Sequence, residues 1–248
     1  MSASGRVRPV STIEPAPGPF ALVGSGEFLP QMVAVDRVLL EGRAPRAAFL
    51  PTAAGQEGEA SIERWLSLGA AHYAAMGIEP VPVRVIDRRD ADDPALIALV
   101  DAVGLIYLSG GNPGYVAETL RGTGMWIAIE AAWRAGTALA GCSAGAMALT
   151  ADAPHVRAGA MTAQPGLGLV AHLAVIPHFD RMAEWDPNVT ARALARRGAG
   201  VTVVGIDEDT ALVGGPVEWT VMGRQRVTVF GPDGATSHPA GARLHLAP

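Results

Sequence analysis

Ser143 lies at the centre of Gly141-Cys142-Ser143-Ala144-Gly145, which matches the pattern G-x-S-x-G. In this pattern a serine occupies a strained turn between a strand and a helix, and small neighbours let the two elements close around it. The context fits, because an apolar run ends at Gly141 and a helical pattern begins at Ala144. The segment predicts a nucleophilic serine. The alternative is a small-residue turn that only packs a helix onto a sheet.

A serine hydroxyl needs a general base at neutral pH, and six histidines are available. His178 directly follows the apolar run Ala174–Pro177, at the expected end of a buried strand. The other five lie in a helical pattern, in a Gly/Pro-rich region or near the C-terminus: His72, His155, His172, His238 and His245. We therefore expect His178 to be the base, the alternative being a hydrogen-bonded histidine of the core.

Three adjacent carboxylates, Asp207-Glu208-Asp209, follow the apolar run Val201–Val204 and could orient the base. Strand alternation would send Asp207 and Asp209 to one face and Glu208 to the other, without saying which face is inward. The alternative is a solvated acidic turn.

Two loops offer backbone N–H groups for a developing oxyanion. The first is the helix N-terminus at Ala144, immediately after the serine. The second is Ser109–Pro113, whose paired glycines let the backbone approach a substrate carbonyl. A plain turn before a helix begun by Pro113 would explain the second loop equally well.

Composition restricts the partners. The formal net charge is −5, and Lys and Arg form no dense stripe, which argues against nucleic acid or an anionic membrane as a main partner. A small or peptide-like ligand fits better. Cys142 is the only cysteine, which excludes an intramolecular disulfide and a multi-cysteine metal site and is consistent with a reducing, cytoplasmic compartment. We expect its side chain to point away from the site as a small buried hydrophobe.

Short apolar runs alternate with helical patterns, which is typical of an α/β fold with a mostly parallel, doubly wound sheet in three layers. We expect one domain over residues 20–248 and a flexible Pro-rich arm over residues 1–19. The expected strands are Phe20–Gly24, Ala47–Pro51, Pro80–Ile86, Gly104–Ser109, Thr137–Gly141 and Leu173–Pro177. The expected helices are Met32–Leu40, Ser61–Met76, Pro94–Val100, Gly114–Arg134 with a break at Gly122–Gly124, Ala144–Leu149, and one from Asp186-Pro187 to Gly198.

The C-terminal part has a different pattern. Val201–Ile206, Ala211–Val213, Val217–Met222 and Arg226–Phe230 predict consecutive strands, and we expect them to form an antiparallel extension at one sheet edge. His155–Leu169 predicts a hairpin or loop. Ligands bind beyond the carboxyl ends of parallel strands, where the sequence places Ser143, His178 and the three carboxylates.

Taken in order, the motifs resemble the serine peptidases that include dipeptidase E and cyanophycinase, within the class-I glutamine-amidotransferase-like superfamily. The resemblance spans Phe20 to Phe230. It rests on Gly24-Ser-Gly-Glu27, Phe49-Leu-Pro-Thr52, Leu108-Ser-Gly-Gly-Asn112, Gly141-Cys-Ser-Ala-Gly-Ala146, Pro177-His-Phe179 and Gly205-Ile-Asp-Glu-Asp-Thr-Ala-Leu212.

The resemblance implies a Ser-His-Glu triad at Ser143, His178 and Glu208, with oxyanion donors at Gly111 and Ala144. It thereby selects Glu208 from the three carboxylates. It implies no metal or organic cofactor, and a homodimer is compatible with it. The substrate-binding candidates within or near these motifs are Asn112, Arg181 and Glu27, and Arg181 is the nearest cation in sequence for an acidic substrate group.

The sequence also departs from cyanophycinase-like members, which carry an Asp-Gln pair before the histidine and a Gly-Gly-Asp-Gln loop. This chain has Ile176-Pro177 and Gly110-Gly111-Asn112-Pro113 instead, so we do not expect specificity for β-aspartyl-arginine.

The sequence allows three other interpretations. An α/β-hydrolase would need the acid before the histidine, with His238 or His245 as base. Dinucleotide binding at Gly24-Ser25-Gly26 lacks the third glycine, because Leu29 occupies that place. A binding or regulatory domain without catalysis would keep the crevice but place the serine hydroxyl and the histidine ring more than about 3 Å apart.

Overall fold

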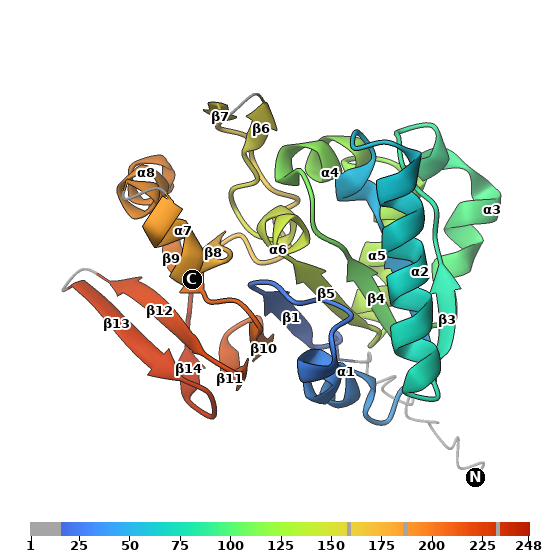
Figure 1. The fold of residues 1–248 in the computed structure, drawn as a ribbon, viewed down its shortest axis with the longest axis horizontal. Coiled ribbons are helices and arrows are strands. Elements are labelled where there is room, and N and C mark those ends of the chain that lie inside the picture. Colours follow the sequence, from blue (N-terminus) through green and yellow to red (C-terminus); the bar gives the residue numbers. More distant parts are fainter. Residues whose placement is uncertain (1–15, 158–159, 186–187, 232–233) are drawn as a thin grey trace, which may run out of the picture.

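The computed structural model describes residues 16–157, 160–185, 188–231 and 234–248 (Figure 1). Two large sheets and a short hairpin make up its strands. The larger sheet has eight strands in the order β14-β11-β10-β1-β5-β4-β2-β3. Its parallel part comprises β1 (Phe20–Val23), β5 (Ala138–Cys142), β4 (Leu105–Leu108), β2 (Arg46–Leu50) and β3 (Glu79–Pro82). The expected mostly parallel core is confirmed.

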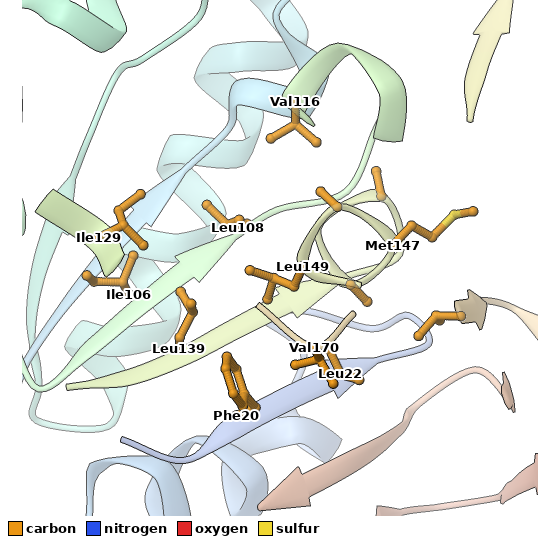
Figure 2. Close-up of a cluster of buried hydrophobic side chains, with 14 of the residues drawn as sticks. Phe20, Leu22, Ile106, Leu108, Val116, Ile129, Leu139, Met147, Leu149 and Val170 are labelled. Atoms are coloured by element: carbon orange, nitrogen blue, oxygen red, sulfur yellow. The ribbon is translucent and has the colours of Figure 1, made fainter. Parts of the chain in front are cut away.

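Alternation along these strands divides the core in two. Phe20, Leu22, Ile106, Leu108 and Leu139 point to one face, which Figure 2 shows packed around Leu149 and its neighbours. The intervening residues, including Ala21, Tyr107 and Cys142, point to the other face. Since both faces of the parallel strands are buried, these strands are continuous apolar runs.

Helices cover both faces, as the predicted three-layer fold requires. The first face is covered by α3 (Pro94–Ile97), α4 (Pro113–Leu120), α5 (Gly124–Arg134) and α6 (Ala144–Leu149). The second is covered by α1 (Val33–Leu40) and α2 (Glu59–Ala75). The predicted break between α4 and α5 is present: Gly122 has a φ of 69°, and the Thr123 side chain caps α5. No helix in the described part of the chain has the length and apolar character needed to span a membrane.

The predicted antiparallel extension is partly correct. Three antiparallel strands do extend the main sheet beside β1: β10 (Thr210–Gly214), β11 (Glu218–Gly223) and β14 (Arg243–His245). The other C-terminal strands form a separate sheet in the order β13-β12-β9-β8, comprising β13 (Gly234–Pro239), β12 (Arg226–Gly231), β9 (Thr202–Ile206) and β8 (Leu173–Ile176). β8 and β9 are parallel to each other within it.

Both faces of β8 and β9 in the second sheet are buried. Val175 and Val204 join the main core, whereas Ala174, Ile176 and Val203 pack with α7 (Phe179–Trp185) and α8 (Val189–Arg196). These strands therefore need a helical cover of their own. In an antiparallel extension at the edge of the main sheet, β8 and β9 would have one face in solvent, and their second apolar face would have no helical cover.

Several local predictions differ from the structure. The helix α7 starts right after His178 and was not predicted, and the predicted helix start at Asp186-Pro187 lies outside the described residues. The Gly/Pro-rich region contains the hairpin β6 (His155–Arg157) and β7 (Ala160–Thr162). Residues 1–15 of the predicted arm also lie outside the described residues. Within the rest of it, the Gly18 N–H donates to the Trp133 carbonyl at 2.8 Å.

Candidate active site

Ser143 connects β5 to α6 in a backbone conformation that is rare for a residue with a side chain, with φ 50° and ψ −107°. The neighbouring glycines explain why the chain can turn there. A Cβ on Gly141 would lie 2.4 Å from the Gly145 carbonyl carbon, and one on Gly145 would lie 2.2 Å from the Leu108 oxygen. The strand and the helix can approach this closely only without those side chains, so the segment has the geometry of a nucleophile elbow.

His178 lies within hydrogen-bonding distance of both predicted partners. Its Nε2 is 3.0 Å from the Ser143 hydroxyl, and its Nδ1 is 3.1 Å from Oε1 of Glu208. If Nδ1 carries the proton and donates it to the carboxylate, Nε2 is left to accept from the hydroxyl. His178 follows β8 with a φ of 48°, and Glu208 lies in the turn between β9 and β10. The structure brings all three predicted residues together.

The neighbouring carboxylates face elsewhere. Asp207 is buried, and its pKa is raised by desolvation and by the nearby negative charge of Asp180. Asp209 lies 3.3 Å from the Arg224 guanidinium. Among the three predicted carboxylates, Glu208 is the one within hydrogen-bonding distance of His178.

Two residues that the sequence did not reveal hold the turn of Glu208. The Glu208 backbone N–H donates to Asp180 Oδ1 at 2.8 Å, and the Gln225 amide donates to Asp180 Oδ2 and to the Glu208 carbonyl. Asp180 lies two residues after His178, so one short segment supplies the imidazole and fixes the turn that carries its partner. Apart from the proximity of Asp180 to His178, no sequence signal could have identified them.

Gly111 and Ala144 lie where an oxyanion hole would form, since both line the same cavity as Ser143 and His178. Gly111 has a φ of 140°, and a Cβ there would lie 2.4 Å from the Ala53 carbonyl oxygen. The next residue, Asn112, donates its backbone N–H to that oxygen at 2.8 Å. Within the described chain, neither the Gly111 nor the Ala144 N–H has a hydrogen-bond acceptor. Both remain available to a ligand.

The cavity has a volume of about 510 Å³, within the range of small-molecule sites of about 300–1,000 Å³. Ser143, His178 and the backbone of Gly111 and Ala144 form one part of its wall. Its other walls come from α6, β7, the end of β8, α7 and α8.

The three predicted substrate-binding residues are not among the described residues that line this cavity. Asn112 caps α4, its side-chain oxygen accepting from the Tyr115 N–H at 3.2 Å. Arg181 is more than half exposed, with Nε 3.6 Å from Glu208 Oε2. Glu27 is buried, and its carboxylate accepts hydrogen bonds from the Gly110 N–H and the Cys142 thiol. The hydrogen bonds of the Glu27 carboxylate are therefore to groups of the protein itself, and not directed into the cavity.

Cys142 points into the core, as predicted, but it is not simply a hydrophobe. Its thiol donates to Glu27 Oε2 at 2.7 Å. Burial and the Glu27 charge raise the pKa of the thiol well above its ordinary value, so the sulfur stays protonated at neutral pH. A protonated, inward-facing sulfur is a poor nucleophile.

Comparison with known proteins agrees with this geometry. The chain matches the model of peptidase family S51 over residues 21–215. A crystal structure of a peptidase from an acI-B1 Actinobacterium is 37% identical, with a TM-score of 0.84 over 94% of this chain and 98% of that one.

Two more distant proteins point the same way. An uncharacterized peptidase of Bacillus subtilis, YgaJ, is 27% identical over 164 residues, which is 64% of this chain and 67% of that protein. A putative peptidase E protein from Listeria monocytogenes is 16% identical, with a TM-score of 0.58 over 91% of this chain and all of that one, and it shows the shared fold. The family match covers most of the chain and includes the elbow, the histidine and the acid. The chain belongs to peptidase family S51 and is a serine-type peptidase.

Proposed function

We propose that this peptidase cleaves an amide bond in a short peptide or small amide with Ser143 as nucleophile, His178 as base and Glu208 as the group that orients the imidazole. The observation that carries the proposal is the chain of two hydrogen bonds through His178, of 3.0 Å and 3.1 Å. Distances this short support a catalytic serine over a non-catalytic binding domain on the same scaffold.

The reaction has two halves. The Ser143 oxygen attacks the carbonyl carbon while its proton passes to His178 Nε2, and the carbonyl oxygen becomes an oxyanion. When the tetrahedral intermediate collapses, the C–N bond breaks and Nε2 returns the proton to the leaving amine. Water then adds to the acyl-enzyme while His178 accepts a proton from it. The ester bond to Ser143 breaks and Nε2 returns this proton to the serine oxygen, which releases the acid and restores the hydroxyl.

Backbone N–H groups stabilise the charged intermediate. Those of Gly111 and Ala144 both line the cavity at Ser143, and removing one such donor in other hydrolases costs roughly 100- to 1,000-fold in kcat. Throughout, the Glu208 carboxylate stabilises the imidazolium that forms when His178 takes the proton.

The test is the labelling of Ser143 by a serine-directed fluorophosphonate, together with turnover of a dipeptide library. The parent is expected to be labelled and to cleave some library members, whereas Ser143→Ala loses both. Ser237→Ala, at an exposed serine of β13, is the matched control and is expected to behave like the parent. Equal turnover by Ser143→Ala and the parent would exclude Ser143 as the nucleophile.

A further inference from the structure

The cavity beside Ser143 has a wall rich in methionine. The lining includes Met147 of α6, Met161 of β7 and Met182 of α7, together with the apolar Val175 and Val189. Unbranched, polarizable methionine side chains adapt to apolar groups of different shapes. None of these five residues offers a hydrogen bond to an acidic or amide side chain.

Both arginines of the described cavity lining come from one element. The helix α8 presents Val189, Arg192, Ala193 and Arg196 to it, which is the spacing of one helix face. Arg196 is held by Asp152, with Nε 3.0 Å from Oδ2, and Arg192 also has an interaction of its own within the protein. The described lining contains two arginines and no acidic side chain, so it is unfavourable for a cationic substrate group and favourable for a carboxylate at the α8 side.

We propose, building on the proposed function, that the cavity takes short peptides with an apolar side chain beside the scissile bond, the peptide's C-terminal carboxylate being directed to Arg192. This assigns the substrate's side chain to the methionine wall and its terminal charge to α8. It differs from the sequence-based expectation that Arg181 would supply the cation, because Arg181 lies outside the cavity lining.

Three dipeptides test the side-chain preference: Leu-Leu, Asp-Leu and Lys-Leu. The parent should cleave Leu-Leu with a kcat/KM roughly 10- to 100-fold above the other two, the gain expected from burying a leucine side chain. Leu-Leu amide tests the carboxylate: its KM should exceed that of Leu-Leu in the parent, and Arg192→Gln should remove the difference. A parent that prefers Asp-Leu would overturn the proposal, and so would equal KM values for Leu-Leu and its amide.

Met161→Asp tests the wall itself, because Met161 belongs to the hairpin and to neither main core cluster. It should lose most of the preference for Leu-Leu. Ile127→Asp, which places the same charge at a 64% exposed position of α5, is expected to keep it. Identical preferences in the two variants would contradict the role of the wall.

Fluorophosphonate labelling separates the two levels of inference. Labelling of Ser143 together with a preference for Asp-Leu would refute the apolar pocket and leave the proposed function intact. If Ser143 is not labelled at all, the proposed function itself fails.

A second, independent observation concerns Glu27. Its side chain is 8% exposed, and its two oxygens bind different segments: Oε1 accepts from the Gly110 N–H at 2.9 Å and Oε2 from the Cys142 thiol at 2.7 Å. Gly110 immediately precedes the oxyanion donor Gly111, and Cys142 immediately precedes Ser143. One carboxylate therefore ties the end of β5 to the loop after β4.

We also infer that Glu27 is a positioning residue, which sets the distance between the Gly111 and Ala144 N–H groups through Gly110 and Cys142. A buried carboxylate is costly unless it is hydrogen-bonded, so the Glu27 carboxylate favours the arrangement in which both Gly110 and Cys142 stay within hydrogen-bonding distance of it. Loss of one contact should move a donor away from the oxyanion and lower kcat with a smaller change in KM.

Cys142→Ala and Cys142→Ser form the matched pair for this inference. The alanine removes the donor to Glu27, and we expect kcat to fall at least roughly 10-fold, since a displaced oxyanion donor costs up to about 1,000-fold. The serine hydroxyl can donate in place of the thiol and should recover most of the loss. Equal kcat in the two variants, with both folded by circular dichroism, would refute the positioning role.

Discussion

Replacing Glu208 by glutamine tests the orienting role of this carboxylate at nearly constant shape. The Glu208→Gln side chain can still accept from His178 Nδ1 through its amide oxygen, so the geometry can persist. What disappears is the negative charge that stabilises the imidazolium formed when His178 takes the serine proton.

The size of the effect follows from the 3.1 Å separation between Nδ1 and Oε1. Coulomb's law at that distance gives about 5 kcal/mol for an effective dielectric constant of about 20, and about 1.3 kcal/mol for bulk water. The Glu208 side chain is 32% exposed, which places the site between these limits. We take about 3 kcal/mol, which corresponds to a rate loss of roughly 100-fold.

The rate constant for fluorophosphonate labelling is the assay, because it follows activation of Ser143 without requiring the natural substrate. Glu184→Gln is the matched control: it removes the same charge from α7, with Glu184 Oε2 3.9 Å from Arg181 Nη1. Its labelling rate should stay within about twofold of the parent, as surface charges contribute little. If Glu208→Gln is labelled as fast as Glu184→Gln, Glu208 does not support the base and the assignment is wrong.

Three further changes probe the scaffold. Gly145→Ala should lower the free energy of unfolding in urea by at least about 2 kcal/mol, because the new Cβ would lie 2.2 Å from the Leu108 oxygen. Gly198→Ala should have little effect, since a Cβ there meets only an ordinary contact. Equal stabilities of the two variants would refute the close-packing argument. Burial raises the pKa of Asp36 above 3.8, so the folded state binds this proton more tightly than the unfolded state, and stability falls as pH rises through the raised value. In thermal melts from pH 4 to 7, the melting temperature of Asp36→Asn should therefore fall less with pH than that of the parent. An equal fall in both proteins would contradict this. Iodoacetamide should not label Cys142 of the native protein at pH 8 but should label it in urea, and rapid native labelling would show that the thiol is exposed or ionised.

Much of the site was predictable because its chemistry lies at strand ends. The apolar runs of β1, β2, β4 and β5 identify a buried parallel sheet, and Ser143 and His178 each follow such a run. The choice of Glu208 required the family resemblance, since alternation gives Asp207, Glu208 and Asp209 no inward direction. The structure distinguishes them by their different partners.

The less predictable parts depend on contacts between distant segments. An apolar run buried on both faces, such as β8 or β9, does not encode which sheet it joins. β13 was missed because Gly234–Pro239 is mostly polar and exposed and has no apolar alternation. The cavity wall depends on how α8 packs on β8, and the Gly110 and Cys142 contacts of Glu27 lie 83 and 115 residues away in sequence.

The proposed active residues belong to two different sheets. Ser143 follows β5 of the eight-stranded sheet, whereas His178 follows β8 of the four-stranded sheet that lies beside it (Figure 1). The hydrogen bond between them therefore responds to any sliding of one sheet against the other, and a shift of about 1 Å would break it. Local opening of the smaller sheet can precede global unfolding. Labelling by fluorophosphonate should then disappear at lower urea concentrations than the far-ultraviolet circular dichroism signal, which makes the enzyme's own chemistry a reporter of the contact between its sheets.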